Sequence, residues 1–277
     1  MTVSHTQVHY SSPRDSFMCF YQTAMILLMA LFTFPQVAES SESDYSLFLL
    51  LGQSNMAGRG VVEDQDTRED DRVFSLTKEL AWVKAKDPIH FDKANVGVGP
   101  GLSFGRAVSM KFPAMKIGLI PCAVGGTSIG DWHPGAFHKQ TKTYPYDDAI
   151  KRALYAKKSG VIKAILWHQG ESDRGKSVDY STEISQLVSR LRIDLGDPSV
   201  PVIAGELASF MNWQEAPTVK FNKDLRALEA GIDKFYVVSS DGFVHGGDRL
   251  HYDSASARLL GQRFAEKFFL VDPIQGR

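Results

Sequence analysis

The feature that most constrains this chain is an alternation between short apolar runs and longer amphipathic segments. The short runs are rich in β-prone residues, whereas the longer ones repeat apolar residues at spacings of three and four, as helices do. This alternation indicates βαβ units on a parallel sheet. It predicts strands at about 46–51, 116–121, 162–167, 202–206 and 235–239, and helices at about 102–111, 146–159, 178–194, 218–230 and 254–269.

The expected fold class is therefore α/β, a three-layer α/β/α sandwich around a central, mostly parallel, five-stranded sheet. Residues 60–101 do not fit the alternation, because they mix a charge cluster with a short apolar run and end in Gly-Val-Gly-Pro-Gly. We interpret them as an extended loop inserted after the first strand. Ligands bind beyond the carboxyl ends of such strands, so this loop is expected to shape the substrate site. A surface excursion without a role is the alternative.

The first 43 residues differ in character from the rest. No charged side chain occurs from Ser16 to Ala38, and Ala24–Phe34 is almost wholly apolar. This pattern predicts a signal peptide with a short linker over 1–43, one catalytic domain over 44–277, and a secreted or periplasmic protein. No stable membrane association is expected after cleavage. An uncleaved membrane anchor over Phe17–Phe34 is the alternative, and Met18 and Met25 are alternative translation starts.

The bulk charge and the cysteines say little about partners. A net charge of −1 gives no basic field that would attract nucleic acid, so no nucleic-acid partner is expected. Removal of the leader would leave Cys122 as the only thiol, which excludes an internal disulfide. Cys122 is interpreted as a small buried residue at a strand rather than as a nucleophile.

A serine stands where a nucleophile would be needed. The first predicted strand runs into Gly52-Gln53-Ser54-Asn55-Met56, which places Ser54 on the tight turn at the carboxyl end of that strand. Gly52 permits a sharp turn, and the sheet geometry directs the hydroxyl toward the ligand crevice. Turn serines are common, so this position alone does not establish catalysis.

A serine hydroxyl needs a base, and the base needs an orienting acid. Asp248 and His251 lie three residues apart just before the last predicted helix, close enough for the carboxylate to accept the proton of imidazole Nδ1. His245 and Asp241 in the same loop are competing candidates.

Developing charge on a tetrahedral intermediate needs hydrogen-bond donors besides the amide of Ser54. Two segments could supply them. One is the glycine-containing stretch 123–128 after the second strand, and the other is 168–173 after the third, where the Gln169 amide could point into the crevice.

These segments together carry a resemblance. Gly52-Gln53-Ser54-Asn55-Met56, Gly125-Gly126-Thr127-Ser128, His168-Gln169-Gly170-Glu171-Ser172 and Asp248-Arg249-Leu250-His251 resemble, in order, the blocks of the SGNH-hydrolase superfamily. More narrowly, they resemble its sialate O-acetylesterase and acetylxylan-esterase branch, carbohydrate esterase family six. The resemblance covers nearly all of the chain after the leader. It implies an SGNH/flavodoxin-like fold and a serine esterase that hydrolyses O-acetyl groups on sugars or polysaccharides.

The resemblance also implies roles for particular residues. Ser54 would be the nucleophile, His251 and Asp248 its triad partners, and the amides of Ser54 and Gly126 part of the oxyanion hole. The wider superfamily has an asparagine in its third block, where this chain has Gln169 and Glu171. We infer that Gln169 replaces that asparagine as a donor, and that Glu171 is an alternative to Asp248 as the orienting acid.

Trp132 is a candidate for stacking against a sugar ring, with core packing as the alternative. No cofactor and no metal site are expected, because the histidines show no recognised ligand spacing such as His-Glu-x-x-His. A metal hydrolase, an inactive carbohydrate-binding protein and a lipase-like esterase are the rival readings. The sequence leaves the particular glycan and the oligomeric state open.

Overall fold

The computed structural model describes residues 1–4, 45–211 and 215–271. The chain divides into two compact units, Met1–Glu42 and Ser43–Arg277, and the second carries all the regular structure among the described residues. The predicted signal peptide and its anchor alternative lie outside the described residues, so both stay predictions. None of the helices in the described part is long and apolar enough to cross a membrane.

A sheet of seven strands forms the centre of the second unit, in the order β3-β2-β4-β1-β5-β6-β7. All pairs are parallel except β2 with β3, so the predicted α/β class is confirmed. The strands are β1 (Tyr45–Gly52), β2 (Val73–Leu76), β3 (Trp82–Lys84), β4 (Ile117–Pro121), β5 (Gly160–His168), β6 (Val202–Gly205) and β7 (Phe235–Val238).

The predicted strand number of five was wrong because β2 and β3 lie inside the segment interpreted as a loop. Both are short, with four and three residues, and stand among charged residues, so neither forms an apolar run of the usual strand length. Both form strands because of their pairing partners. β2 pairs with β4 in parallel, and β3 pairs with β2 as the antiparallel edge strand. The sheet therefore recruits this segment through backbone hydrogen bonds rather than through hydrophobic periodicity.

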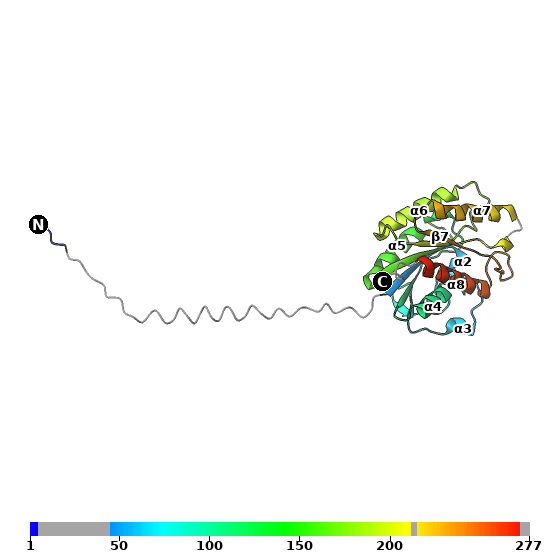
Figure 1. Ribbon diagram of the computed structural model, residues 1–277, viewed down its shortest axis with the longest axis horizontal. Coiled ribbons are helices and arrows are strands. Elements are labelled where there is room, and N and C mark those ends of the chain that lie inside the picture. The colour runs from blue at the N-terminus through cyan, green and yellow to red at the C-terminus, as the bar shows by residue number, and fades with distance from the viewer. Residues whose placement is uncertain (5–44, 212–214, 272–277) are drawn as a thin grey trace. The chain divides into compact units, whose positions relative to one another are not determined.

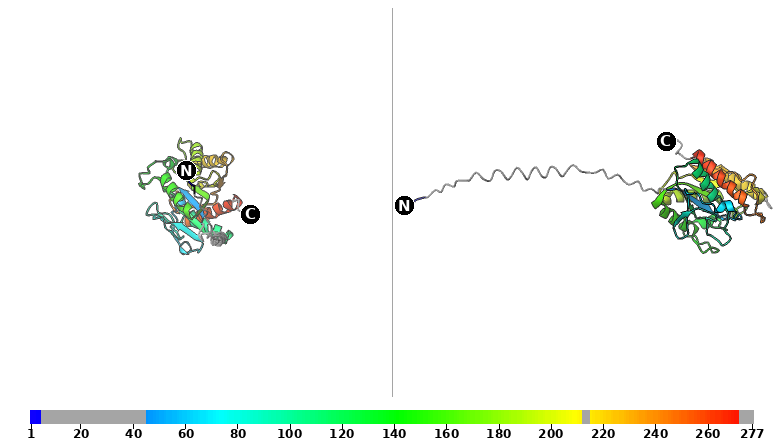
Figure 2. Two further views of the ribbon diagram at one scale, coloured as in Figure 1. Left: turned by 90° about the vertical axis from the view of Figure 1, so that its left-hand side faces the viewer. Right: turned by 90° about the horizontal axis from the view of Figure 1, so that it is seen from below.

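Helices cover both faces of the sheet (Figure 1). Figure 1 shows α5, α6 and α7 on one side and α4 and α8 on the other, and Figure 2 shows these layers from two further directions. All five predicted helices are present, with ends shifted by a few residues. The helices are α2 (Ser54–Ala57), α3 (Asp64–Thr67), α4 (Pro100–Lys111), α5 (Pro145–Ala156), α6 (Tyr180–Leu195), α7 (Glu215–Ala227) and α8 (Ser254–Val271), with short 3-10 turns at Ile129–Trp132, Lys157–Ser159, Ser209–Met211 and Leu228–Ala230.

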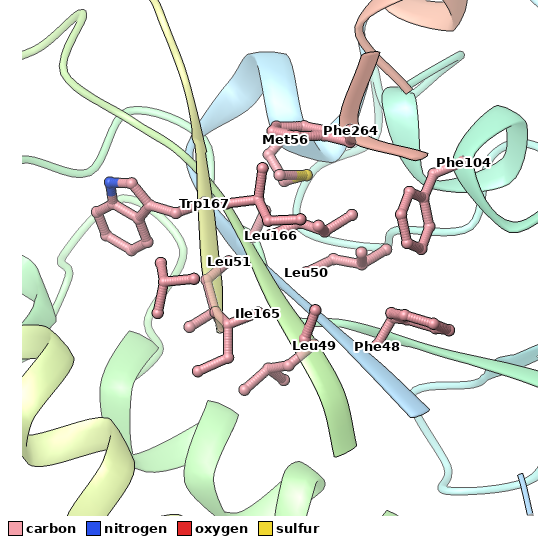
Figure 3. Packing of buried hydrophobic residues seen from close by; sticks show 14 of the residues in the cluster. Phe48, Leu49, Leu50, Leu51, Met56, Phe104, Ile165, Leu166, Trp167 and Phe264 are labelled. Carbon is pink, nitrogen blue, oxygen red and sulfur yellow. The ribbon is translucent and has the colours of Figure 1, made fainter. Parts of the chain in front are cut away.

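The central strand β1 is buried along its whole length, as its apolar run at residues 47–51 predicts for a parallel strand covered on both faces. Figure 3 shows Phe48 and Leu50 pointing toward Phe104 of α4, whereas Leu49 and Leu51 point to the opposite side. The rings of Phe48 and Phe104 meet edge to face, with centroids 4.8 Å apart. Alternate side chains of β1 thus fill both layers of the core and fix the strand's register.

The connections change direction at β1. The chain passes from β1 to β2 and β4 on one side, and then crosses to β5, β6 and β7 on the other. Such a switch point leaves a crevice beyond the carboxyl end of the strand, and β1 ends there at Gly52, two residues before Ser54.

Candidate active site

Ser54 lies at the turn that leaves β1, as the sequence predicted. Gly52 has φ +130°, and a Cβ at that position would lie 2.0 Å from the carbonyl oxygen of His168. Only glycine allows β1 to approach β5 so closely at this turn. Gln53 then donates its amide to the same oxygen at 2.9 Å, and Ser54 becomes the first residue of α2. Its amide is therefore among the helix N–H groups that have no acceptor within the helix.

The loop before α8 brings a base to Ser54. His251 Nε2 lies 3.0 Å from Ser54 Oγ, although 197 residues separate the two in sequence. The other ring nitrogen, Nδ1, lies 2.6 Å from Asp248 Oδ2. The remaining oxygen of Asp248 accepts the amides of Leu250 and His251, both at 2.8 Å. The structure thus brings together the three residues that the sequence proposed as a triad.

The environment keeps the Asp248 carboxyl ionised. Partial burial raises its pKa, but hydrogen bonds from the His251 amide and ring and from the Leu250 amide outweigh this, so the pKa lies below its ordinary value. An ionised carboxylate on Nδ1 holds the imidazole in the tautomer that leaves Nε2 free to accept a proton from the serine. The competing residues of the loop do not take these places. His245 Nδ1 accepts the Gly247 amide at 2.9 Å, and the ring nitrogens of His251 are paired with Asp248 and Ser54 rather than with Asp241.

Asn55, which the sequence analysis did not single out, connects the serine turn to the histidine loop. Its Nδ2 donates to the carbonyl of Leu250 at 3.2 Å, and its Oδ1 accepts the amide of Tyr252 at 3.0 Å. Asn55 therefore binds the main chain on both sides of His251 while standing next to Ser54. A side chain with one donor and one acceptor directly after the nucleophile was the available sequence signal.

Glu171, the alternative acid, makes no hydrogen bond to His251 among the described contacts. Its Oε1 accepts Nδ2 of Asn55 at 2.6 Å and lies 3.6 Å from His168 Nδ1. The side chain is only 1% exposed, and this burial raises its pKa against the smaller opposing effect of the Asn55 hydrogen bond. Glu171 thus holds the Asn55 side chain by a hydrogen bond, and of the two acids only Asp248 is hydrogen-bonded to the imidazole.

The glycine turn after β4 lies against Ser54. A Cβ on Gly125 would stand 3.4 Å from the Cβ of Ser54, and Gly126 has φ +89°. The Gly125 amide donates to Asp92 Oδ2 at 2.8 Å, and that oxygen also pairs with Arg59 at 2.6 Å. Both charged side chains are nearly fully buried, with 5% and 2% exposed. This ion pair, which the sequence analysis missed, fixes the turn at which Gly126 was predicted to donate.

The structure corrects the prediction for Gln169. Its Nε2 lies within hydrogen-bond distance of three acceptors inside the protein, Gln53 Oε1 at 3.1 Å, the Thr127 carbonyl at 3.1 Å and Asp173 Oδ2 at 2.5 Å. Two hydrogens shared among three internal acceptors leave no donor directed at an oxyanion. Gln169 instead ties the third block to the turn that contains Thr127.

The structure also corrects the prediction that Trp132 stacks against a sugar. The residue is fully buried, its ring meets Trp167 edge to face at 5.2 Å, and its Nε1 donates to Thr127 Oγ1 at 3.2 Å. With no face exposed, the indole packs in the core, which was the alternative reading.

The other sequence candidates are separate from one another. Burial raises the pKa of the Cys122 thiol to about 11, which suits a buried structural cysteine. His133 pairs with Glu183 at 2.7 Å, His138 with Thr141 at 2.8 Å, and His168 Nε2 with Tyr252 at 2.8 Å. Within the described ranges, no group of three or more His, Cys, Asp or Glu residues is arranged to hold a metal ion.

The fold and the site together define an α/β/α protein with a serine, a histidine and a carboxylate in contact at the carboxyl edge of the sheet. Comparison with known proteins agrees with this class. The family model described as carbohydrate esterase, sialic acid-specific acetylesterase, matches residues 44–270. A probable carbohydrate esterase of Arabidopsis thaliana is 32% identical over 247 residues, which cover 80% of this chain and 89% of the relative.

Solved structures share the fold. An X-ray structure of an Arabidopsis thaliana protein aligns with a TM-score of 0.72 at 31% identity, covering 82% of this chain and 98% of that one. The structure of NanS aligns with a TM-score of 0.69 at 17% identity, covering 82% and 97%, and this likeness shows the fold alone. The chain belongs to the sialic acid-specific acetylesterase family of carbohydrate esterases, as the four sequence blocks indicated, and is a carboxylic-ester hydrolase.

Proposed function

We propose that this protein removes O-acetyl groups from carbohydrate by two-step acyl transfer through Ser54. The observation that carries the proposal is the continuous contact from Ser54 Oγ to His251 Nε2 at 3.0 Å and from His251 Nδ1 to Asp248 Oδ2 at 2.6 Å. Family membership supports an acetylated carbohydrate as the class of substrate.

In the first step, His251 Nε2 takes the proton of Ser54 as Oγ bonds to the acetyl carbonyl carbon. The amides of Ser54 and Gly126 donate to the resulting oxyanion. The carbon–oxygen bond to the sugar then breaks, and His251 returns the proton to the departing sugar oxygen. In the second step the same nitrogen takes a proton from water as the water oxygen attacks the carbonyl carbon of the acetyl-serine. The bond from that carbon to Ser54 Oγ then breaks, His251 returns the proton to Oγ, and acetate is released.

The test measures acetate release by the purified protein from acetylated sialic acid, acetylated xylan and acetylated pectin, with Ser54→Ala alongside. We expect the wild type to release acetate from at least one substrate. Ser54→Ala should lower kcat by about 10⁴-fold or more with KM little changed, because the mutation removes the nucleophile and leaves binding groups in place. Undiminished hydrolysis by the variant would overturn the mechanism.

We also propose that the protein is exported through its first 43 residues. The support is the uncharged stretch Ser16–Ala38 in the sequence. Fractionation of producing cells, with the amino terminus of the product sequenced, tests this. Export predicts a product in the secreted or periplasmic fraction that begins near residue 44, whereas a full-length product in the membrane fraction would favour the anchor.

A further inference from the structure

A cavity of about 300 Å³ lies beside the glycine turn, beyond the carboxyl end of β4. Its wall includes Val124, whose amide donates to the Gly52 carbonyl at 2.9 Å, and Asp92, whose carboxylate holds the Gly125 amide. Neither Ser54 nor His251 lines it. The cavity therefore shares a wall with the predicted oxyanion turn while remaining separate from the reacting groups. Its volume is at the lower end of the ~300–1,000 Å³ usual for small-molecule sites.

A partly exposed aromatic side chain borders this cavity. Phe91 is 38% exposed, and the guanidinium of Arg152 lies 4.8 Å from its ring centroid. Arg152 is itself held by the carbonyls of Leu76, Thr77 and Pro121 at 2.7, 2.9 and 3.2 Å. One face of the ring is thus supported by a fixed side chain. Such a preformed apolar surface suits the C–H face of a pyranose ring.

A buried polar side chain lines the same cavity. His90 is 4% exposed, and neither of its ring nitrogens makes a hydrogen bond of ordinary geometry to any described residue. Burial lowers the pKa of His90 to about 3 against the smaller opposing effects of the Asp92 charge and the nearby Leu50 carbonyl, so the ring is neutral with one donor and one acceptor nitrogen. Buried polar groups are nearly always hydrogen-bonded, and a hydroxyl group can donate to the acceptor nitrogen.

A second cavity flanks the site on the other side, near Asp173 and between α6 and α7. The two rings that line it, Tyr180 and Phe221, pack against each other with centroids 4.5 Å apart, and Phe221 is only 8% exposed. The cavity at Phe91 is the better match for a ring that has one apolar face and several hydroxyl groups.

We propose that the cavity at His90 and Phe91 binds a sugar ring of the acetylated carbohydrate whose ester Ser54 attacks. This inference rests on the proposed function and adds the place at which the carbohydrate binds. Phe91 contacts the apolar face of the ring, and His90 hydrogen-bonds a hydroxyl group. A small aryl acetate has no sugar ring, so it gains nothing from these contacts.

The test compares kcat/KM for acetylated xylo-oligosaccharide and for 9-O-acetyl-N-acetylneuraminic acid with kcat/KM for 4-nitrophenyl acetate. The ratio of interest is kcat/KM for the glycan that the wild type hydrolyses better, divided by kcat/KM for the aryl acetate. Phe91→Ala should lower this ratio about five- to tenfold, mainly through a higher KM for the glycan. His90→Phe, which keeps a ring but removes both nitrogens, should lower the same ratio. The aryl acetate assay and the thermal midpoint of each variant report on folding.

The matched control is Tyr155→Ala. Tyr155 is 37% exposed and has Lys158 at 5.4 Å from its ring centroid, but it does not line the cavity. The control should leave the ratio within about twofold of wild type. A wild-type ratio in Phe91→Ala, alongside glycan hydrolysis by the wild type, would overturn the subsite and leave the proposed function standing. Aryl acetate hydrolysis without acetate release from acetylated sialic acid, xylan or pectin would overturn both.

Discussion

The loop that carries Asp248 and the turn that carries Glu171 each place a carboxyl group near His251, but in contrasting environments. Asp248 has 52% of its side chain exposed and accepts two main-chain amides as well as the imidazole. The Glu171 side chain is 1% exposed and accepts a hydrogen bond from Nδ2 of the Asn55 side chain. The pKa of Asp248 is lowered by its hydrogen bonds, whereas the pKa of Glu171 is raised by burial.

The difference indicates that Asp248 can stabilise a charged imidazole, whereas Glu171 has a structural role. A carboxylate stabilises an imidazolium only if it is ionised and in contact with the ring, and Asp248 meets both conditions. Glu171 is in a place where ionisation is unfavourable, and its visible partner is Asn55, which holds the histidine loop. We infer that the buried turn positions His251 and that the exposed loop supplies the orienting charge.

Among the residues that support Ser54, the largest effect is expected for Asp248→Asn. An amide at this position favours the wrong tautomer of His251 and removes the charge opposite the imidazolium, so kcat should fall about 10³–10⁴-fold with little change in KM. Initial rates on 4-nitrophenyl acetate and on an acetylated glycan measure this. Asp241→Asn, in the same loop, is the control. A smaller loss in Asp248→Asn than in Glu171→Gln would reverse the assignment of the two acids.

Asn55→Ala should follow, with kcat about 10²-fold lower. The change removes the hydrogen bonds to the main chain on both sides of His251, so the ring no longer stays in reach of Ser54. Asn222 offers a matched control, because its side chain likewise brackets one residue, accepting the Leu207 amide at 2.9 Å and donating to its carbonyl at 2.8 Å. Asn222→Ala should lose stability but keep kcat; equal kcat losses in both variants would count against a positioning role for Asn55.

Asp92→Asn extends the comparison to the glycine turn. It breaks a buried ion pair with Arg59, so the free energy of unfolding should fall by up to about 3–5 kcal/mol, and kcat should fall about tenfold as Gly125 loses its anchor. Asp66→Asn breaks a comparable pair with Arg258, 2.6 Å long and remote from the triad. Denaturant unfolding and rates measured well below the midpoints separate the two effects. If Asp66→Asn lowers kcat as much, the loss reflects stability alone.

The smallest effect on catalysis is expected for Glu171→Gln, less than about tenfold in kcat, but it should change the pH dependence of stability. Because burial raises the pKa of Glu171 in the folded state, the unfolded chain releases its proton first as the pH rises through the ordinary range near ~4.3. The wild type therefore loses stability with rising pH until the folded-state pKa is passed. Thermal midpoints of wild type and variant across pH 4–8 test this, since the variant should lose less. Parallel curves would show that the Glu171 proton does not affect folding.

Five strands of the sheet and the five long helices could be predicted from the sequence, because each depends on its own hydrophobic pattern. β1, β4, β5, β6 and β7 each form a short apolar run, and the five long helices carry clear three-and-four periodicity. β2 and β3 could not be read in this way, because their stability comes from pairing with β4 and with each other. Short edge strands among charged residues show little local signal.

The same distinction between local signals and long-range contacts applies to the site. Ser54, Asp248 and His251 were candidates because a serine needs a base and the base needs an acid, and the family resemblance of their sequence blocks implied the triad. Gln169 and Trp132 were misassigned because a sequence does not tell whether a side chain points into a crevice or into the core. Asn55, Asp92 and Arg59 were missed because their partners lie far along the chain.

The sequence by itself determined the α/β class and the layered arrangement of helices and strands, and it proposed Ser54 at the turn after β1 with His251 as its base, because these depend on hydrophobic period and on chemistry within a few residues. Only the tertiary structure decided which acid contacts the imidazole, which polar side chains brace the two turns, and that a cavity lies beside the glycine turn. Those outcomes depend on burial and on contacts between segments up to 197 residues apart, and no local pattern encodes such distances.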